Sequence, residues 1–240
     1  MRILIVRHGE PNYKIDSLTE KGWREAELLS NRLIKENIDY FYVSPLGRAR
    51  DTASFTLKKF QKEATQLEWL REFDAHVDKP GISDNHRAWD WLPKEMVKYN
   101  ELFDEHDWLN QENIKNSDTK EEYKWVVDNF DKLLEKHGYK RNKRLYKVVS
   151  PSHDTICLFC HFGLEMVLLS HLLNVSPYPL WHGFCAAPTS VTTIYTEERE
   201  KDEVIFRIQS FGDVSHLYNN EPVSFAGRYD ECYGDDSRWE

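Results

Sequence analysis

Three short segments of the chain combine histidine, arginine and glycine, and each follows a stretch that favours a β-strand. They are Arg7-His8-Gly9-Glu10, Ser44-Pro45-Leu46-Gly47-Arg48 and His161-Phe162-Gly163. An arginine guanidinium can bind two phosphate oxygens at once, and an imidazole can attack phosphorus as a nucleophile. In an open α/β sheet, ligands bind beyond the carboxyl ends of the strands. We therefore expect Arg7, His8, Arg48 and His161 to meet there.

The apolar pattern locates the elements that must position these residues. Ile3 to Val6 is a short, unbroken apolar run, as expected for a strand buried on both faces of a parallel sheet. The runs at 39–43 and 155–160 resemble further strands, and they end at the second and third segments. Ser44-Pro45 then opens a helix through about Phe60, so that Arg48 lies in its first turns, where backbone N–H groups add donors for an anion.

The remaining elements continue an alternation of strands and helices. A helix capped by Ser17 or Thr19 is expected to run to about Glu36, with one apolar face made of Trp23, Ala26, Leu29 and Leu33. Further helices are expected at 119–137, with Gly138 as its C-cap, and at 164–173, and further strands at 145–149, 191–195 and 204–208. This alternation predicts an α/β fold with a mostly parallel central sheet.

The stretch from about Asp74 to Asp118 departs from this alternation. It is irregular, charged and rich in aromatic residues, and five of the eight tryptophans fall between Trp69 and Trp125. We interpret residues 74–150 as a helical, cap-like insertion within a single domain that spans residues 1–240. Whether the insertion only adds stability or also selects the substrate as a lid is left open.

Taken in order, the motifs resemble those of the histidine phosphatases, the phosphoglycerate mutase-like superfamily. The resemblance covers Arg-His-Gly-Glu at 7–10, Leu-Thr-Glu-Lys-Gly at 18–22, the Ser-x-Leu-x-Arg-Ala-x-x-Thr block at 44–52 and the late histidine at 161. It implies a three-layer α/β/α fold in which His8 is the nucleophile that becomes phosphorylated. Arg7, Arg48 and His161 would bind the phosphoryl oxygens, with no metal or other cofactor required.

The same resemblance implies that Glu72 is the general acid and base. Family members take this residue from a glutamate some twenty-odd residues beyond the arginine block, and Glu72 matches in position, although Glu63 and Glu68 compete with it. Glu10 is expected to orient the first segment instead of donating protons. A role for His153-Asp154 as the His-Asp pair of the acid-phosphatase branch is rejected, because the pair precedes its strand.

Three functions follow from these residues. The first is hydrolysis of a phosphomonoester of a small metabolite. The second is a phosphoglycerate mutase, which the sequence disfavours because Pro11 to Lys14 and Arg71 to Asp74 replace the mutase blocks Ser-x-Trp-Asn and Glu-Arg-His-Tyr-Gly. The third is a regulatory protein that binds phosphate without turnover, which the intact set of two histidines and two arginines disfavours.

Composition limits the partners and the compartment. A formal net charge of −9 argues against nucleic-acid and anionic-membrane partners, and no apolar run is long enough to cross a bilayer, so a cytoplasmic location is expected. The basic stretch Lys136 to Lys147 is interpreted as a solvated loop. Cys157, Cys160, Cys185 and Cys232 are interpreted as reduced core residues. A homodimer is left open.

Overall fold

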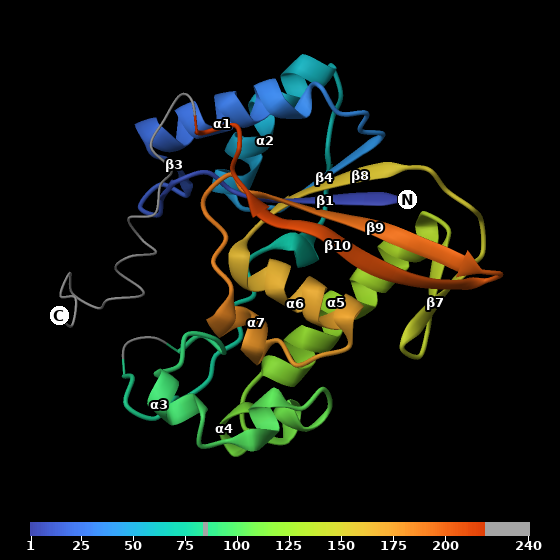
Figure 1. Ribbon diagram of the computed structural model, residues 1–240. Coiled ribbons are helices and arrows are strands. Elements are labelled where there is room, and N and C mark those ends of the chain that lie inside the picture. The colour runs from blue at the N-terminus through green and yellow to red at the C-terminus, as the bar shows by residue number, and fades with distance from the viewer. Residues whose placement is uncertain (84–85, 219–240) are drawn as a thin grey trace.

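The first strand, β1 (Arg2–Arg7), is buried on both faces, as its unbroken apolar run predicts. Ile3 and Ile5 lie in one hydrophobic core, whereas Leu4 and Val6 lie in a second. Side chains alternate between the two faces of a strand, so the sheet separates these cores. The computed structural model therefore has three layers, with helices on both faces of a central sheet (Figure 1). The expected α/β/α architecture is confirmed.

The structure describes residues 1–83 and 86–218, and within them eight strands form the central sheet. Their order is β5 (Thr65–Gln66), β4 (Tyr40–Val43), β8 (Thr155–Cys160), β1, β9 (Val191–Glu200), β10 (Glu203–Asp213), β7 (Leu145–Val148) and β6 (Tyr139–Asn142). The pairings from β5 to β1 are parallel, and those from β1 to β6 are antiparallel. Strands β5, β4, β8, β10 and β6 all run in the same direction as β1, and β9 and β7 run in the opposite direction. Most strands of the described sheet therefore share one direction, as expected.

Helices α1 (Glu20–Leu33) and α2 (Gly47–Phe60) cover one face of the sheet, and α5 (Thr119–Lys136) and α6 (Phe162–Leu173) cover the other (Figure 1). The shorter elements are β2 (Pro11–Asn12), β3 (Ser17–Leu18), α3 (Pro93–Met96), α4 (Glu112–Lys115), α7 (Tyr178–Gly183) and 3₁₀ turns at Glu68–Leu70, Asn100–Phe103 and Asp107–Asn110. The apolar patterns had not indicated α7, which spans less than two turns. No helix in the described part of the chain is long and apolar enough to span a membrane.

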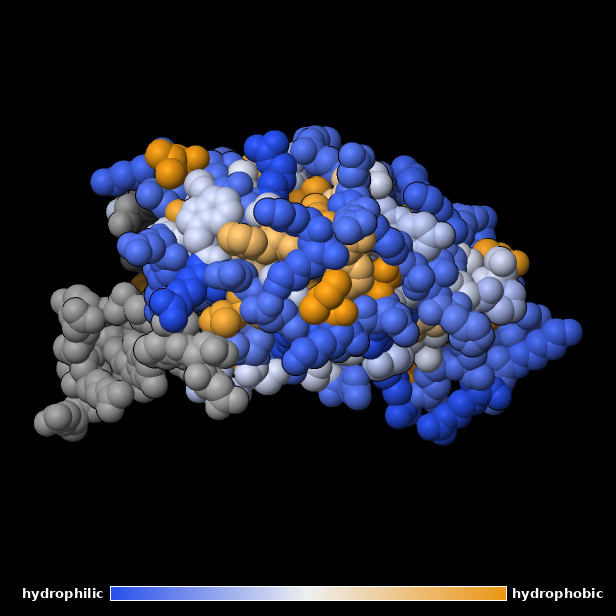
Figure 2. All heavy atoms as spheres, turned by 90° about the horizontal axis from the view of Figure 1, so that it is seen from above, coloured by the Kyte–Doolittle hydropathy of each residue, from blue (hydrophilic) through white to orange (hydrophobic). Residues whose placement is uncertain are grey.

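Helix α1 begins where its cap predicts, but its buried face differs from the prediction. Thr19 is the N-cap, and its hydroxyl accepts a hydrogen bond from the Gly22 N–H at 3.0 Å. Trp23 is 36% exposed, because it lies to one side of the buried Ala26–Leu29–Leu33 stripe and contacts α2 edge-on through Phe55. The outer surface of α1 and α2 is mostly hydrophilic, with hydrophobic residues in small separate groups (Figure 2).

Two interpretations of the C-terminal half are corrected. The basic stretch is not a loop, because it forms most of the β6–β7 hairpin, in which Tyr139 and Tyr146 turn inward onto Phe206 while most of the basic residues point outward. Cys157 and Cys160 are buried as expected, but Cys185 is exposed on the loop after α7. Cys232 lies outside the described residues.

The tryptophan-rich stretch packs into the core beneath the sheet. Trp69, Trp91 and Trp108 are buried together with residues of α5 and α6. The predicted insertion at 74–150 also contains α5, β6 and β7, which belong to the main layers of the fold. Its irregular part is therefore 74–118, whose described residues form turns, two 3₁₀ turns and the short helices α3 and α4.

Gly138 follows α5 at φ +99°, where a side chain is strained, and a Cβ atom there would collide with the Ser150 carbonyl oxygen. We expect Gly138→Ala to lower the free energy of unfolding by about 2 kcal/mol or more, measured by urea denaturation. Gly183→Ala is the control, since a Cβ at Gly183 meets nothing within 4 Å. Equal stability of the two variants would contradict this explanation.

Candidate active site

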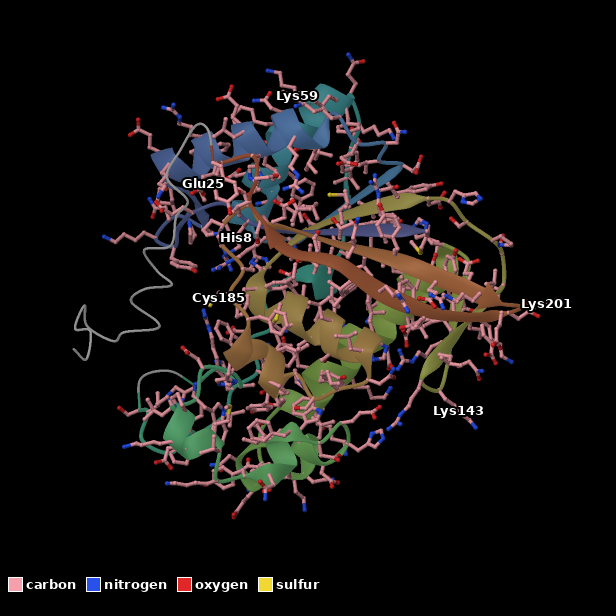
Figure 3. All side chains as sticks on the ribbon, in the orientation of Figure 1. His8, Glu25, Lys59, Lys143, Cys185 and Lys201 are labelled. Atoms are coloured by element: carbon pink, nitrogen blue, oxygen red, sulfur yellow. The ribbon has the colours of Figure 1, made fainter. Side chains whose placement is uncertain are left out.

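The three histidine- and arginine-bearing segments meet at one edge of the sheet. Strands β4, β8 and β1 are parallel neighbours, with Val43 beside Phe159 and Arg7 beside Cys160. The residues that follow them therefore emerge together, and the ring centroids of His8 and His161 lie 5.1 Å apart. Figure 3 shows His8 at this edge, with Lys143 and Lys201 at the far end of the molecule.

His8 is held as a neutral imidazole with a defined orientation. The side chain is 2% exposed, and its Nδ1 lies 2.7 Å from the Gly9 carbonyl oxygen. A carbonyl only accepts hydrogen bonds, so Nδ1 carries the proton and Nε2 keeps its lone pair. Burial lowers the pKa of His8 well below its ordinary value, and the positive charges of Arg7 and Arg48 lower it further. Nε2 is therefore available as a nucleophile at neutral pH.

His161 is fully buried and offers a ring nitrogen to the site. Its Nε2 lies 2.7 Å from the Ser44 hydroxyl, which also accepts a hydrogen bond from the Leu46 N–H. The hydroxyl still has its own proton, and when it donates that proton to Nε2, the proton of the neutral ring lies on Nδ1. Nδ1 has no hydrogen-bond partner within the described ranges. Burial, then His8 and Arg48, lower the pKa of His161 well below its usual value.

Both arginines are held in place by contacts within the protein. Arg7 donates to the Ala186 carbonyl at 2.5 Å, and its guanidinium lies 5.7 Å from the ring centre of Phe162. Arg48 donates to the Asp16 carboxylate at 2.6 Å, and its buried Nε lacks a partner among the residues that the structure describes. The guanidinium of Arg48 therefore keeps its Nε as a donor for a ligand anion.

Glu72 lies against the first turn of α6, beside the second histidine segment. Its Oε1 accepts hydrogen bonds from the Leu164 N–H at 2.9 Å and the Phe73 N–H at 3.0 Å. Burial raises the pKa of Glu72 in spite of these donors. A Cβ atom at Gly163 would lie 2.8 Å from Oε1 and 2.7 Å from Nε1 of Trp89, so a side chain at this position would displace one or both groups. The competing Glu63 and Glu68 are exposed.

Several residues around the site were not anticipated. Arg87, from the tryptophan-rich stretch, lies 5.2 Å from the ring centre of Trp89, and its charge lowers the pKa of both Glu72 and His161. Asp16 accepts from Gly47 N–H as well as from Arg48. Neither residue lies in a recognisable motif, and no local signal in the sequence could have identified them.

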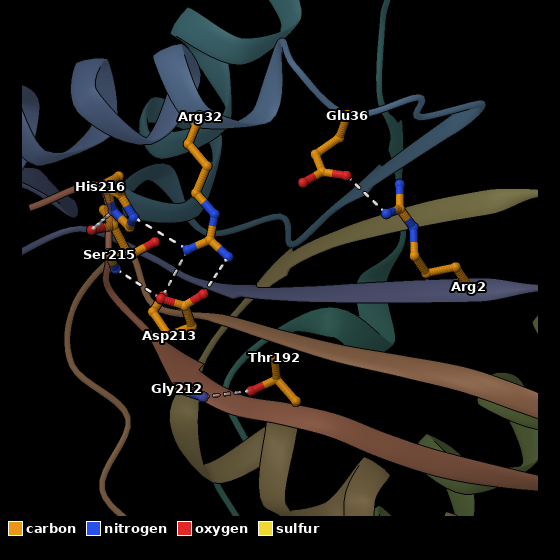
Figure 4. A network of polar contacts seen from close by, with 9 residues as sticks. Arg2, Arg32, Glu36, Thr192, Gly212, Asp213, Ser215 and His216 are labelled. Carbon is orange, nitrogen blue, oxygen red and sulfur yellow. Dashed lines mark hydrogen bonds and ion pairs between the residues drawn. The ribbon is translucent and has the colours of Figure 1, made fainter.

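A network behind His8 connects the loop before β9 to α1. The His8 carbonyl accepts from the Thr189 N–H at 3.2 Å, and the Thr189 hydroxyl lies 3.0 Å from Nε2 of His216. Arg32 of α1 reaches His216 and binds the Asp213 carboxylate at 2.7 Å (Figure 4). Within residues 1–83 and 86–218, no group of three or more His, Cys, Asp or Glu side chains is placed to hold a metal ion.

Comparison with known proteins agrees with this arrangement. Residues 3–208 match the family model of the histidine phosphatase superfamily (branch 1). A 2,3-bisphosphoglycerate-dependent phosphoglycerate mutase from Thermoplasma acidophilum is 28% identical over 40% of this chain, and the match spans 62% of that relative's length.

Solved structures share the fold. A phosphoserine phosphatase from Entamoeba histolytica, crystallised as a mutant with phosphoserine, has a TM-score of 0.56 and 20% identity over 90% of this chain and 98% of its own. A mycobacterial glucosyl-3-phosphoglycerate phosphatase has a TM-score of 0.57 and 16% identity over 88% of this chain and 98% of its own. The match of nearly the whole chain to one family model places it in a family, and this protein belongs to branch 1 of the histidine phosphatase superfamily.

Proposed function

We propose that this protein hydrolyses a phosphomonoester of a small metabolite through a phosphohistidine on His8. The observation that carries the proposal is a pair of buried groups beside His8, Nε of Arg48 and Nδ1 of His161, that lack a protein partner in the described part of the chain. A buried polar group left without a partner costs about 1–3 kcal/mol. A phosphoryl group bound at His8 would supply oxygens to both.

The reaction takes two steps. Nε2 of His8 attacks phosphorus, the bond from phosphorus to the alcohol oxygen breaks, and Glu72 donates a proton to that oxygen. Water then attacks the phosphohistidine, Glu72 takes its proton, and the N–P bond breaks to release inorganic phosphate. Arg7, Arg48 and His161 stabilise the oxygens of the transferring group in both steps.

A phosphoglycerate mutase is the second candidate, because the curated relative bears that name. The two reactions share the phosphohistidine and differ in whether water or a sugar acid receives the phosphoryl group. Phosphatases for phosphoserine, glucosyl-3-phosphoglycerate and α-ribazole are among the proteins of the same fold. Incubation with 3-phosphoglycerate separates the candidates, since a hydrolase releases phosphate whereas a mutase isomerises the substrate.

His8→Ala removes the nucleophile, so we expect turnover to fall by roughly 10⁴-fold or more. Phosphate release from a panel of phosphomonoesters, measured in EDTA, provides the test, together with trapping of an acid-labile phosphoenzyme in the wild type. His153→Ala is the matched control, because His153 is exposed and precedes β8 at the opposite end of the sheet. Undiminished hydrolysis by a folded His8→Ala protein would rule out the mechanism.

Glu72→Gln removes the proton donor, so the loss should depend on the leaving group. We expect kcat to fall about 10²- to 10³-fold for alkyl phosphates and far less for p-nitrophenyl phosphate, whose leaving group needs no proton. Because the pKa of Glu72 is raised, the acid form persists to higher pH than in a free glutamate, and wild-type turnover of alkyl phosphates should decline as pH rises through that pKa.

The Glu72→Gln variant should lack this decline. The control is Glu68→Gln, the same chemical change at an exposed residue of the preceding 3₁₀ turn. An equal loss of activity on both classes of ester would instead indicate that Glu72 only supports the structure of the site.

A further inference from the structure

Helix α1 carries a buried carboxyl group, Glu25, that the proposed reaction does not use. The side chain is 0% exposed, and Figure 3 shows it on the same side of the molecule as His8. Its Oε2 accepts a hydrogen bond from the Glu10 N–H at 2.9 Å. Its Oε1 is buried and has no hydrogen-bond partner in the described ranges. Burying a polar oxygen in this way is costly, so the position of Glu25 requires an explanation.

The Glu10 peptide belongs to the segment that carries His8, and that segment is packed backbone to backbone against α1. A Cβ atom at Gly22 would collide with the Glu10 carbonyl oxygen, and one at Gly9 would lie 2.9 Å from the Gly22 carbonyl oxygen. Glu25 lies one helical turn after Gly22, and Gly9 N–H donates to Thr52 of α2 at 2.8 Å. The Glu25 and Thr52 bonds therefore fix the two peptides that follow His8.

Burial favours the neutral form of Glu25. Burial raises the pKa of Glu25 to about 7, and the Glu10 carboxylate raises it as well, whereas the Glu10 N–H bond, Lys21 and Arg7 oppose the shift. Glu10 is held nearby by the Thr19 hydroxyl at 2.8 Å and by Lys21 at 3.8 Å. An ionised Glu25 would place a second negative charge next to Glu10 with one oxygen unpartnered.

We propose that Glu25 is a positioning residue that holds the His8 segment through the Glu10 peptide, and that it does so as the neutral carboxylic acid. Ionisation adds a buried negative charge behind the segment that receives the phosphate dianion, so phosphate binding weakens. This inference rests on the proposed function for its activity measurements, and it also predicts a change in stability that requires no activity.

The direction of the stability change follows from the pKa. Below the ordinary pKa of a glutamate, Glu25 is protonated in both the folded and the unfolded chain and contributes no pH dependence. Between that value and about 7, the unfolded chain releases the proton while the folded protein retains it, so rising pH favours unfolding. Glutamine at this position cannot ionise and removes the effect.

The experiment compares wild type, Glu25→Gln, Glu25→Leu and the control Glu27→Gln, which makes the same change on the exposed side of α1. For each protein, kcat/KM on p-nitrophenyl phosphate and the melting temperature are measured from pH 5 to pH 8.5. The leaving group of p-nitrophenyl phosphate needs no proton from Glu72, and Glu72 is unchanged in all four proteins, so differences between their pH profiles report on Glu25. At pH 6 we expect the kcat of Glu25→Gln to lie within about twofold of the wild-type value. Between pH 6 and pH 8.5, the kcat/KM of Glu25→Gln should fall several-fold less than the kcat/KM of the wild type.

Glu25→Leu leaves the Glu10 N–H without its acceptor, so we expect a loss of about 10- to 100-fold in kcat at every pH. The melting temperature of Glu25→Gln relative to wild type should rise with pH, whereas that of Glu27→Gln should not. The proposal is wrong if Glu25→Gln has the same pH profile and the same relative melting temperature as Glu27→Gln. It is also wrong if Glu25→Leu folds and keeps the wild-type kcat.

If Glu25→Leu does not fold, the comparison of Glu25→Gln with wild type and with Glu27→Gln still tests the proposal. If wild type hydrolyses no ester of the panel, the proposed function fails, while the pH dependence of the melting temperatures still tests whether Glu25 is neutral.

Discussion

The structure depends on holding two imidazoles and two guanidinium groups together at one buried edge of a sheet. Four cationic groups in this space would repel one another, and burial removes the difficulty by keeping His8 and His161 neutral. The remaining positive charge, on Arg7 and Arg48, is what an anion would neutralise. The parallel strands β1, β8 and β4 make this convergence possible, because each ends at the same edge.

The charge of Arg7 acts on three buried carboxyl groups. Glu25 of α1, Glu72 and Glu165 of α6 are each shifted to a raised pKa by burial, and in each case the positive charge of Arg7 opposes the shift. The negative charge of a phosphate dianion bound to Arg7 would offset the positive charge of Arg7, so Arg7 would no longer lower these pKa values. The pKa of all three groups would then rise further, so substrate binding would favour the protonated form of Glu72, the form that a proton donor must have when the ester bond breaks.

The sequence predicted the elements whose pattern is local. The apolar run of β1 and the cap at Thr19 give positions that the structure confirms, and the order of motifs indicated the family. The contributions of Asp16 and Arg87 could not be predicted, because each depends on how distant segments pack. Trp23 and the β6–β7 hairpin were misjudged for a related reason: apolar or charged composition does not tell which side of an element faces the core.

The antiparallel half of the sheet also serves the site, through its topology. Strand β9 runs against β1, and Val191, its first residue, pairs with Val6, near the end of β1. The loop that precedes β9 must therefore lie beside the residues that follow β1. From this loop the Ala186 carbonyl binds Arg7 and the Thr189 N–H binds the His8 carbonyl. A parallel neighbour would instead have its first residue at the opposite end of β1, so the reversal of direction at β9 supplies two backbone contacts that parallel pairing at this position could not provide.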